Sequence, residues 1–505
     1  MLEIIDYAIL ILYLVGMVAI TIYTKNRSKS VNDFLLAGKK GLNGWMSAFA
    51  YGTTYFSAVI FIGYAGKFGA QYQLAATWIG IGNAILGSLI AWLVLAKRTK
   101  TMTSNLKAKT MPEFFEKRYD SKNLKIVSAI IIFIFLIPYS ASVYNGLSSL
   151  FETVFAIPGW VVMIVLAAVT ALYLFVGGYY ATALSDFIQG IIMIIGVALM
   201  VTFFMGSKQV NWDLSNLQWF TFNSSNKGLY GDTVSLISLI LLTSFGVWAL
   251  PQTIHKYYTV RDDKAIKQGT IVSTLFALII GFGAYFVGGL SSKFLEVGSI
   301  NPDYIVPTML SMGIIPVGLL GIIAVLILSA SMSTLSSVSL ASASVVAIDL
   351  YKGKINKEAD DKKVNKVMKI LCLVFIAVSV ILAILNEKFN LAAIAYMMGL
   401  SWGTLAGCFM GPYVLGVMWK KVTKPAVWAS IISSLVLTVA LIFVLGAFSP
   451  ASNGTFGSII KCGVGCSPLI GVICMAFSLI ITVIVSLLTK PVQEEMINLA
   501  FNKGN

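Results

Sequence analysis

Long apolar runs separated by short polar segments fill the chain from end to end. A helix needs roughly 20 apolar residues to cross the hydrocarbon core of a bilayer, and its backbone must satisfy every hydrogen bond internally. The runs therefore predict an all-α membrane protein with about thirteen spans. The predicted spans cover residues 5–25, 42–68, 74–97, 124–155, 159–177, 180–204, 232–257, 265–290, 316–348, 366–386, 389–418, 425–447 and 467–489.

Two of these spans carry polar or helix-weakening residues near their middle. The second reads Ala50-Tyr-Gly-Thr-Thr-Tyr-Phe-Ser-Ala58, and the seventh contains both Gly246 and Pro251. Glycine and proline are common in membrane helices, which is the simpler explanation of either break alone. The two breaks lie five helices apart, however, and interrupted helices at matching positions of two halves indicate a midplane binding site. The spacing predicts two five-helix repeats, inverted because five is odd.

The domain organisation follows from this pattern. The polar segments are too short to form a separate soluble core, so residues 1–505 are predicted to be a single membrane domain. No cleavable signal peptide is expected, because residues 1–4 carry no basic segment. The predicted parts are an extra N-terminal helix at 5–25, a first repeat at 42–204, an inverted second repeat at 232–418, two C-terminal helices at 425–489 and a short tail at 490–505.

Composition and charge support this class. The chain is 58% hydrophobic and 11% charged, whereas a soluble domain carries about 25% charged residues. The net charge of +15 could indicate nucleic-acid binding, but 30 of the 36 lysines and arginines fall on the loops and span ends of one side. The positive-inside rule then places the N-terminus outside and the C-terminus inside. The lipid bilayer is the expected surroundings, and nucleic acid is not an expected partner.

The ninth span contains a run of small hydroxyl residues, from Ser329 to Ser339. Most such residues in membrane helices serve close packing or bond to their own preceding turn. Ser333 and Thr334, together with the carbonyl of Ala330, place three oxygens within about one turn, and hard cations prefer oxygen ligands. An unwound second span could add free carbonyls at Thr53 and Phe56. We predict a Na⁺ site at these five residues; a proton-coupled carrier is less favoured, since none of the five titrates.

Acidic residues are scarce in the apolar spans. Asp6 and Glu152 fall at outer edges, where water is close, and Asp186 lies near the cytoplasmic end of the sixth span. An ionisable residue inside the bilayer is a functional candidate by default, but Asp186 could equally cap a helix N-terminus. Because no span contains arginine, we expect Asp186 to lack a salt-bridge partner and to meet a passing cation.

Cys462 and Cys466 lie near the last outer loop, and their spacing allows a disulfide without requiring one. A zinc site is not expected, because the chain has one histidine. Catalytic triads, paired acids and phosphate-binding loops are not recognisable. We therefore predict a transporter and not an enzyme.

Four motifs together resemble the sodium:solute symporter family over nearly the whole chain. Ala330-Ser-Met-Ser-Thr334, followed by Val346–Tyr351, is similar to the family's sodium-binding helix. Leu184–Gln189 resembles its aspartate motif, and Gly63–Gly66 and Pro251–Lys256 fit its two broken helices. The resemblance implies a LeuT-type fold with inverted repeats. It also implies that Thr53, Phe56, Ala330, Ser333 and Thr334 hold the shared sodium ion, and that Asp186 lies on its exit route.

The likeness of Thr54–Ala58 and Ile305–Met309 to the pantothenate and monocarboxylate branch favours a small carboxylate as the solute, imported with Na⁺ by alternating access. The alternatives are an amino-acid carrier of the proline type, a sialic acid carrier, or a transporter-like solute sensor or channel. Proline carriers of the family have an acid at the position of Tyr55. The candidate solute-binding residues are Tyr55, Ser57, Trp248, Gln252, Tyr396 and Ser401.

The expected partners are Na⁺, a small organic solute and lipid; no obligate protein partner is inferred. The chain is expected to be a multi-pass protein of a plasma membrane, of the bacterial inner-membrane type.

Overall fold

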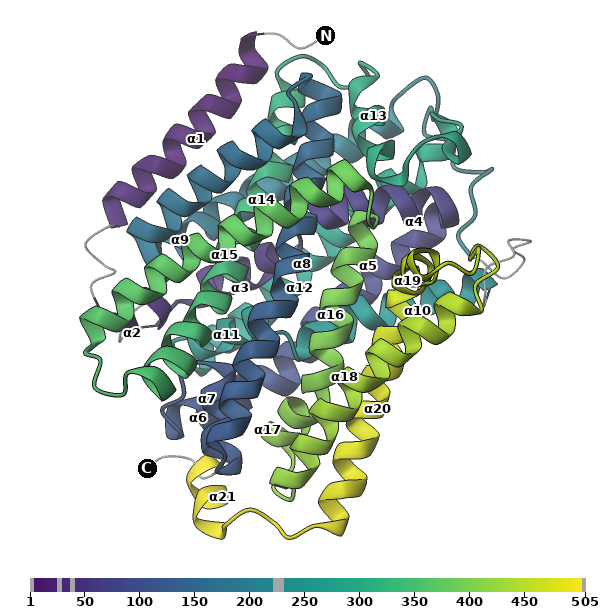
Figure 1. Ribbon diagram of the computed structural model, residues 1–505. Coiled ribbons are helices and arrows are strands. Elements are labelled where there is room, and N and C mark those ends of the chain that lie inside the picture. Colours follow the sequence, from purple (N-terminus) through teal and green to yellow (C-terminus); the bar gives the residue numbers. More distant parts are fainter. Residues whose placement is uncertain (1–3, 25–29, 37–40, 221–230, 502–505) are drawn as a thin grey trace.

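The computed structural model describes residues 4–24, 30–36, 41–220 and 231–501, and over these residues the protein is helical. The only β-type pairing among them is a single bridge between Leu42 and Val260. The long helices are α1 (Ile4–Thr24), α8 (Lys122–Phe155), α9 (Gly159–Met205), α12 (Asp263–Gly289), α14 (Leu319–Ser344), α15 (Asp361–Phe389), α16 (Ile394–Phe409), α18 (Lys424–Ala447) and α20 (Ser467–Leu488). Figure 1 shows them packed as one bundle.

Shorter helices complete the bundle and its two ends. They are α2 (Val31–Leu36), α3 (Gly44–Tyr55), α4 (Ala65–Tyr72), α5 (Thr77–Gly82), α6 (Lys97–Asn105), α7 (Met111–Tyr119), α10 (Gly231–Phe245), α11 (Pro251–Tyr258), α13 (Ile305–Ser311), α17 (Gly416–Met418), α19 (Phe456–Gly465) and α21 (Glu494–Phe501). Wider π-helical turns at Val59–Tyr64, Asn83–Ile90, Trp92–Ala96, Val345–Ile355 and Met410–Leu415, and tight 3₁₀ turns at Gln73–Ala76, Gly246–Trp248, Ser291–Lys293, Val297–Ser299 and Pro302–Tyr304, connect or extend them.

In the described residues, ten helices are long and apolar enough to cross a membrane, or eleven if the bent pair Thr233–Trp248 and Pro251–Tyr258 is one span. Two of them, Val59–Asn105 and Gly159–Met205, contain 47 residues each. A straight helix of that length is about 70 Å long, more than twice the thickness of the hydrocarbon core. Each run contains one non-helical residue of positive φ, Gln73 (φ 53°) and Gly178 (φ 62°). Both fall in predicted loops.

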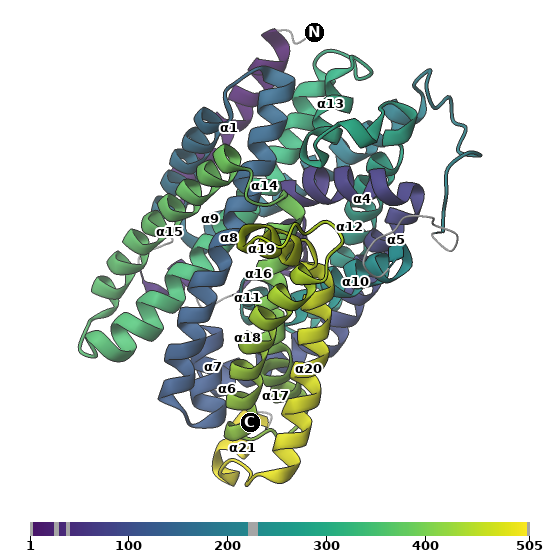
Figure 2. The same cartoon turned by 45° about the vertical axis from the view of Figure 1, so that its right-hand side comes forward.

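Most observed helices begin and end within a few residues of the predicted spans, although two helical runs continue past the predicted ends, to Asn105 and to Ile355. The expected all-α membrane fold is confirmed. The count of thirteen spans and the repeat boundaries stay predictions. Helix α1 begins at the opposite end of the molecule from the terminal helix α21 in both views, as an odd number of spans requires (Figures 1 and 2). The orientation in the membrane also stays a prediction.

Helix α1 lies along the flank of the bundle, where it packs against α9 and α14 (Figure 1). Its acid Asp6 is fully buried, contrary to the expectation of a wet outer edge. The carboxylate accepts the N–H groups of Gly318 and Gly321 at 2.9 and 2.8 Å. These are unpaired donors at the start of α14, and a negative charge there is stabilised by the helix dipole. Asp6 therefore fastens α1 to the helix that carries the hydroxyl run.

Helices α5 and α12 approach each other through glycine. A Cβ atom on Gly80 would lie only 2.4 Å from the carbonyl carbon of Gly281, closer than any real contact. Gly69 is similarly placed against the backbone of Gly288 at 2.2 Å. Small residues that let helix backbones meet are the usual basis of helix association in membranes, where the hydrophobic effect does not act between helices.

We expect Gly80→Ala to lower the thermal unfolding temperature in detergent, because the added methyl group would force α5 and α12 apart. Overpacking of this kind costs about 1–3 kcal/mol. Gly457→Ala is the matched control: Gly457 is also helical, and a Cβ atom there meets nothing within 4 Å. Equal melting temperatures for the two variants would contradict the close-packing role of Gly80.

Candidate functional site

The second predicted span is broken, as expected. Helix α3 ends at Tyr55, and Phe56 takes an extended conformation (φ −107°, ψ 112°) before the π-helical turn begins at Val59. The hydroxyl of Ser57 accepts the N–H of Val59 at 3.3 Å, a local bond that competes with helix continuation. The break leaves backbone polar groups in the middle of the bundle, where only protein or a bound ligand can satisfy them.

The seventh span is broken too. Helix α10 ends at Phe245, a 3₁₀ turn runs to Trp248, and Leu250 is extended (ψ 125°) before Pro251 starts α11. The two halves are bent by 43°. Proline suits the first position of a helix because the missing N–H would be unpaired there in any case. Both predicted interruptions are therefore present.

Four of the five predicted sodium-site residues meet where α3 packs on α14. The hydroxyl of Ser333 donates to Thr53 Oγ1 at 2.8 Å. The hydroxyl of Thr334 lies 3.1 Å from the Ala330 carbonyl oxygen and 3.3 Å from that of Thr53. All four residues are fully buried. The fifth, Phe56, forms the helix break itself, with its N–H bonded to the Gly52 carbonyl at 3.0 Å.

This cluster joins neutral oxygens from a continuous helix and a broken one. Hydroxyl and carbonyl oxygens are suitable ligands for a hard cation, and none of the four residues carries a charge or titrates near neutral pH. A monovalent ion bound there would replace the hydroxyl-to-oxygen bonds that now connect α3 and α14. Its binding would thereby depend on how the two helices sit against each other.

Asp186 lies on α9, eight residues after the kink at Gly178, so it is not in the first turn of a helix and the capping alternative is wrong. The expectation that it lacks an ion-pair partner is also wrong. Lys256 Nζ of α11 lies 3.7 Å from Asp186 Oδ2, and both side chains are buried, with at most 1% of either exposed. Lys256 was not identified as a partner from the sequence because it falls at the end of the seventh span, where a lysine side chain normally reaches water.

The ion pair is connected to the hydroxyl cluster. Lys256 Nζ donates to Ser337 Oγ at 2.9 Å, and Ser337 Oγ in turn lies 2.9 Å from Thr54 Oγ1. Thr54 follows Thr53 directly in the chain. Residues of α3, α9, α11 and α14 thus form one continuous polar network around the broken second span.

Tyr55 and Trp248, both predicted to bind solute, have structural hydrogen-bond partners. The hydroxyl of Tyr55 donates to the Thr243 carbonyl at 2.6 Å, and Trp248 Nε1 donates to the Leu86 carbonyl at 3.0 Å. These bonds fix both broken spans onto their neighbours. The predicted Gln252 differs, because its Oε1 is buried and accepts no hydrogen bond among the described residues.

The other predicted residues are spread over a wider region. Ser57 lies at the break of the second span, and Ser401 donates to the Phe135 carbonyl of α8. Tyr396 lies toward the end of α16 that faces α4, with Lys67 Nζ 4.3 Å from its ring centre. The six candidates therefore do not form one compact site.

Trp402 and Tyr139, two residues that lie near the helix breaks, were not identified from the sequence. The ring of Trp402 is 6.1 Å from Tyr55 and 5.5 Å from Tyr139, and a Cβ on Gly246 would lie 3.6 Å from it. Trp402 Nε1 and the Tyr139 hydroxyl are buried without a hydrogen-bond partner in the described part of the chain. The sequence offered one signal for each residue: Trp402 directly follows the candidate Ser401, and Tyr139 lies in the middle of the span that forms α8. With Gln252 they leave three unpaired polar groups near the helix breaks.

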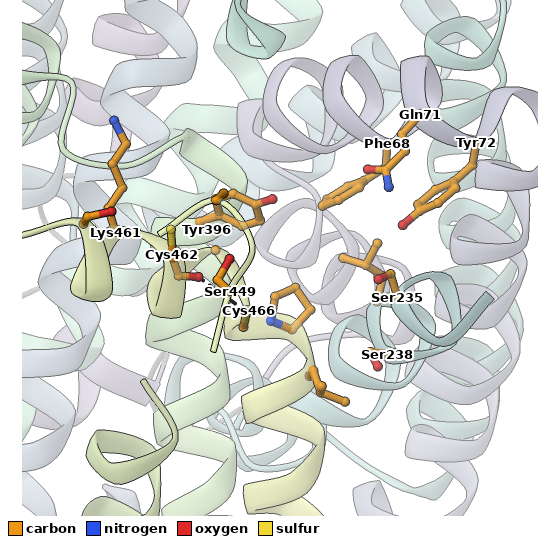
Figure 3. A pocket seen from close by; sticks show the side chains of 16 residues that line it. Phe68, Gln71, Tyr72, Ser235, Ser238, Tyr396, Ser449, Lys461, Cys462 and Cys466 are labelled. Atoms are coloured by element: carbon orange, nitrogen blue, oxygen red, sulfur yellow. Dashed lines mark hydrogen bonds between the residues drawn. The ribbon is translucent and has the colours of Figure 1, made fainter. Parts of the chain in front are cut away.

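A cavity of about 480 Å³ lies against α4 and α10, the halves of both broken spans that the predicted orientation places outside. Figure 3 shows Phe68, Gln71 and Tyr72 on one side of it and Tyr396 on the other, with Ser235 and Ser238 along one wall. Tyr396 is thus a residue of this outer cavity. The cavity is large enough for a small organic molecule.

Cys462 and Cys466 border the same cavity on α19 and at the start of α20. The Cys466 thiol donates to the Cys462 carbonyl oxygen at 3.4 Å. Both cysteines are free in the structure, so the spacing that allowed a disulfide is not used for one there.

An outer segment closes over the start of α16. Asp303 Oδ2 accepts the N–H of Ile394, the first residue of that helix, at 3.1 Å. Burial raises the pKa of the Asp303 carboxyl from 3.8 to about 6, and the Ile394 N–H and the charge of Lys67 oppose part of the rise. The same segment contacts the broken second span, since a Cβ on Gly66 would lie 2.7 Å from the Pro302 carbonyl oxygen.

The sequence profile described as the Sodium:solute symporter family matches residues 34–433. The osmoregulated proline transporter OpuE of Bacillus subtilis is 27% identical over 88% of this chain and 89% of its own. The sodium/proline symporter of Escherichia coli is 28% identical over 88% of this chain and 90% of its own. Each identity extends over nearly the whole of both chains.

Among solved structures, a Na⁺-coupled sialic acid symporter in a substrate-bound, outward-open state superposes with a TM-score of 0.76 at 18% identity. It covers 97% of this chain and 99% of that one. At this identity the likeness concerns the fold alone, and it confirms the LeuT-type fold that the motifs implied.

The raised pKa of Asp303 predicts a pH-dependent stability. Because the folded protein holds this proton more tightly than the unfolded chain, stability should fall as the pH rises from about 4 to about 6 and stay low above that. Asp303→Asn keeps an acceptor for Ile394 and removes the charge, so we expect its melting temperature at neutral pH to exceed that of the wild type by a few degrees. The measurement is thermal unfolding of both proteins between pH 5 and pH 7.5; an unchanged difference across that range would contradict the assignment.

Proposed function

Because the chain belongs to the sodium:solute symporter family, we propose that it imports a small zwitterionic amino acid of the proline type together with Na⁺. The protein is a secondary transporter and not an enzyme, and it is a multi-pass protein of the plasma membrane. The finer assignments, which are the ion site, the solute and the route of the ion, are argued below.

The observation that carries the proposal is the meeting of four oxygen-bearing residues at a helix break. We assign the sodium ion to the carbonyls of Thr53, Phe56 and Ala330 and the hydroxyls of Ser333 and Thr334. The contacts of Ser333 and Thr334 with Thr53 support this assignment, because a cation held there bridges the broken α3 and the continuous α14. Asp186 supports an exit toward the cytoplasm, since its carboxylate lies beside Ser333, one of the proposed ion ligands, and could attract the ion as it leaves.

The ion site can control the solute site through the break. Sodium would hold α3 against α14 and so fix the position of Phe56 and Ser57, next to the ring of Tyr55. The solute would then bind near Gln252, Trp402 and Tyr139, whose polar atoms are buried and unpaired. A membrane potential of 100 mV adds about 2.3 kcal/mol per sodium charge to the driving force.

The solute class is revised from the expected small carboxylate. The relatives that match along nearly the whole chain are named as proline carriers, whereas the likeness to the pantothenate and monocarboxylate branch rests on two short stretches. The electrostatics agree with a zwitterion. Lys256, the buried lysine beside this region, is already paired with Asp186, so an anionic solute would enter without a free cationic partner.

Tyr55 sets a condition on how an amino acid could bind. Proline carriers of the family have an acid at this position, and here the phenol is committed to the Thr243 carbonyl. The ammonium group of a solute would therefore rely on neutral acceptors, of which Gln252 Oε1 is the clearest. A carboxylate group would bind N–H donors, such as Trp402 Nε1 or the backbone at the helix breaks.

The sodium site predicts a specific effect of Ser333→Ala. Loss of one ligand oxygen should raise the Na⁺ concentration for half-maximal uptake roughly tenfold, which corresponds to about 1.4 kcal/mol. Ser331→Ala is the matched control, because Ser331 lies on the same helix and bonds only to the Ile327 carbonyl of its own preceding turn. Equal Na⁺ dependence of the two variants in proteoliposomes would place the ion elsewhere.

The solute class is tested by uptake into proteoliposomes of purified protein, with an inward Na⁺ gradient or with K⁺ in its place. We expect accumulation of labelled proline, or of a similar small amino acid, against its gradient and only with Na⁺. Accumulation of pantothenate, a monocarboxylate or sialic acid instead would refute the amino-acid assignment. Equilibration of a solute without accumulation would indicate a channel.

A further inference from the structure

Lys256 is a lysine held entirely inside the helical bundle. Its ammonium group lies 3.7 Å from Asp186 Oδ2, 2.9 Å from Ser337 Oγ and 5.0 Å from the centre of the Tyr179 ring. Only 1% of the side chain is exposed. Two other elements, α9 and α14, thus surround this positive charge of α11, the second half of the broken seventh span.

Asp186 needs a cation at this position. Neither of its carboxylate oxygens accepts a hydrogen bond from the residues that the structure describes, and the side chain is fully buried. A buried carboxylate without hydrogen bonds or a counter-ion is strongly unfavourable, so the charge must be neutralised by whatever cation lies next to it. Among the described residues the Lys256 ammonium is the group that does so.

The surroundings of this ammonium are also those of a metal-cation site. Ser337 and the Asp186 carboxylate supply oxygens, and the hydroxyl of Ser333 faces the same carboxylate. The Ser337 hydroxyl is also hydrogen-bonded to that of Thr54. Hydroxyls and a carboxylate are ligands that a hard cation accepts. Ser333 belongs to the proposed sodium site, so the two cation positions are neighbours along one face of α14.

We propose that the Lys256 ammonium takes the place of a second co-transported cation beside Asp186. The inference rests on the proposed Na⁺-coupled uptake and specifies its stoichiometry, which is one Na⁺ for each solute molecule. The second positive charge never leaves the protein, because it is part of α11. Removing it would leave the oxygens of Asp186 and Ser337 open to Na⁺ from solution.

The test is the Na⁺ dependence of solute uptake in proteoliposomes, combined with the number of ²²Na⁺ ions bound per purified protein. In the wild type we expect a Hill coefficient of about 1 and one bound ion. In Lys256→Gln we expect the coefficient to rise toward about 2, with a second bound ion, because the Hill coefficient is limited by the number of sites. Lys256→Arg keeps the charge and should keep one ion.

Two further variants isolate the cause. Asp186→Asn combined with Lys256→Gln removes both charges and should return the number of bound ions to one. Lys97→Gln removes the charge of a lysine in an exposed pair with Asp263 and should change nothing. The ²²Na⁺ count needs only folded protein, so it remains decisive if Lys256→Gln binds ions but does not transport.

The outcomes separate this inference from the proposed function. Two bound ions in the wild type, or a single bound ion in folded Lys256→Gln, would overturn the role of Lys256 while leaving Na⁺-coupled uptake intact. If Lys256→Gln does not fold, Lys256→Met, which also removes the charge, takes its place in the ²²Na⁺ count. Uptake by the wild type that does not respond to Na⁺ would instead overturn the proposed function, and the stoichiometry with it.

Discussion

Backbone N–H and C=O groups inside a bilayer must find hydrogen-bond partners or ligands within the protein, and the rest of the structure depends on this constraint. Two helices are broken within the bundle, at Phe56 and at Gly246–Leu250. Each break is enclosed by other helices: α12 and α14 contact α3, and α16 lies against the turn at Gly246. Close glycine contacts such as Gly80 with Gly281 bring the surrounding helices near enough to exclude lipid.

The same enclosure creates the sites. A free carbonyl at a helix break can serve as an ion ligand where a neighbouring helix brings hydroxyl groups next to it. Helix α14 does this with Ser333 and Thr334, which reach Thr53 of α3. In the proposed mechanism the ion, the break and the solute are connected, because the residues proposed to hold the ion also determine the conformation of the chain at Phe56 and Ser57.

Few charged side chains are buried inside the described part of the bundle. Asp6 neutralises the start of α14, and the Asp186–Lys256 pair joins α9 to the inner half of the seventh span. These two buried acids are therefore matched by a helix end and by an ammonium group. Under the proposed role of Lys256, a fixed positive charge beside the proposed ion site reduces the number of cations that must be co-transported.

The sequence by itself predicted the apolar spans, the two breaks, the family and four residues that meet at the first break, because these depend on apolar length, helix-breaking residues and local motifs. It could not determine which side chains far apart in the chain would meet. The partnership of Asp186 with Lys256, the burial of Asp6 and the approach of Trp402 and Tyr139 to Tyr55 were decided by tertiary packing. A span's own residues define its hydrophobic length, whereas the surroundings of a polar side chain depend on how neighbouring helices cross.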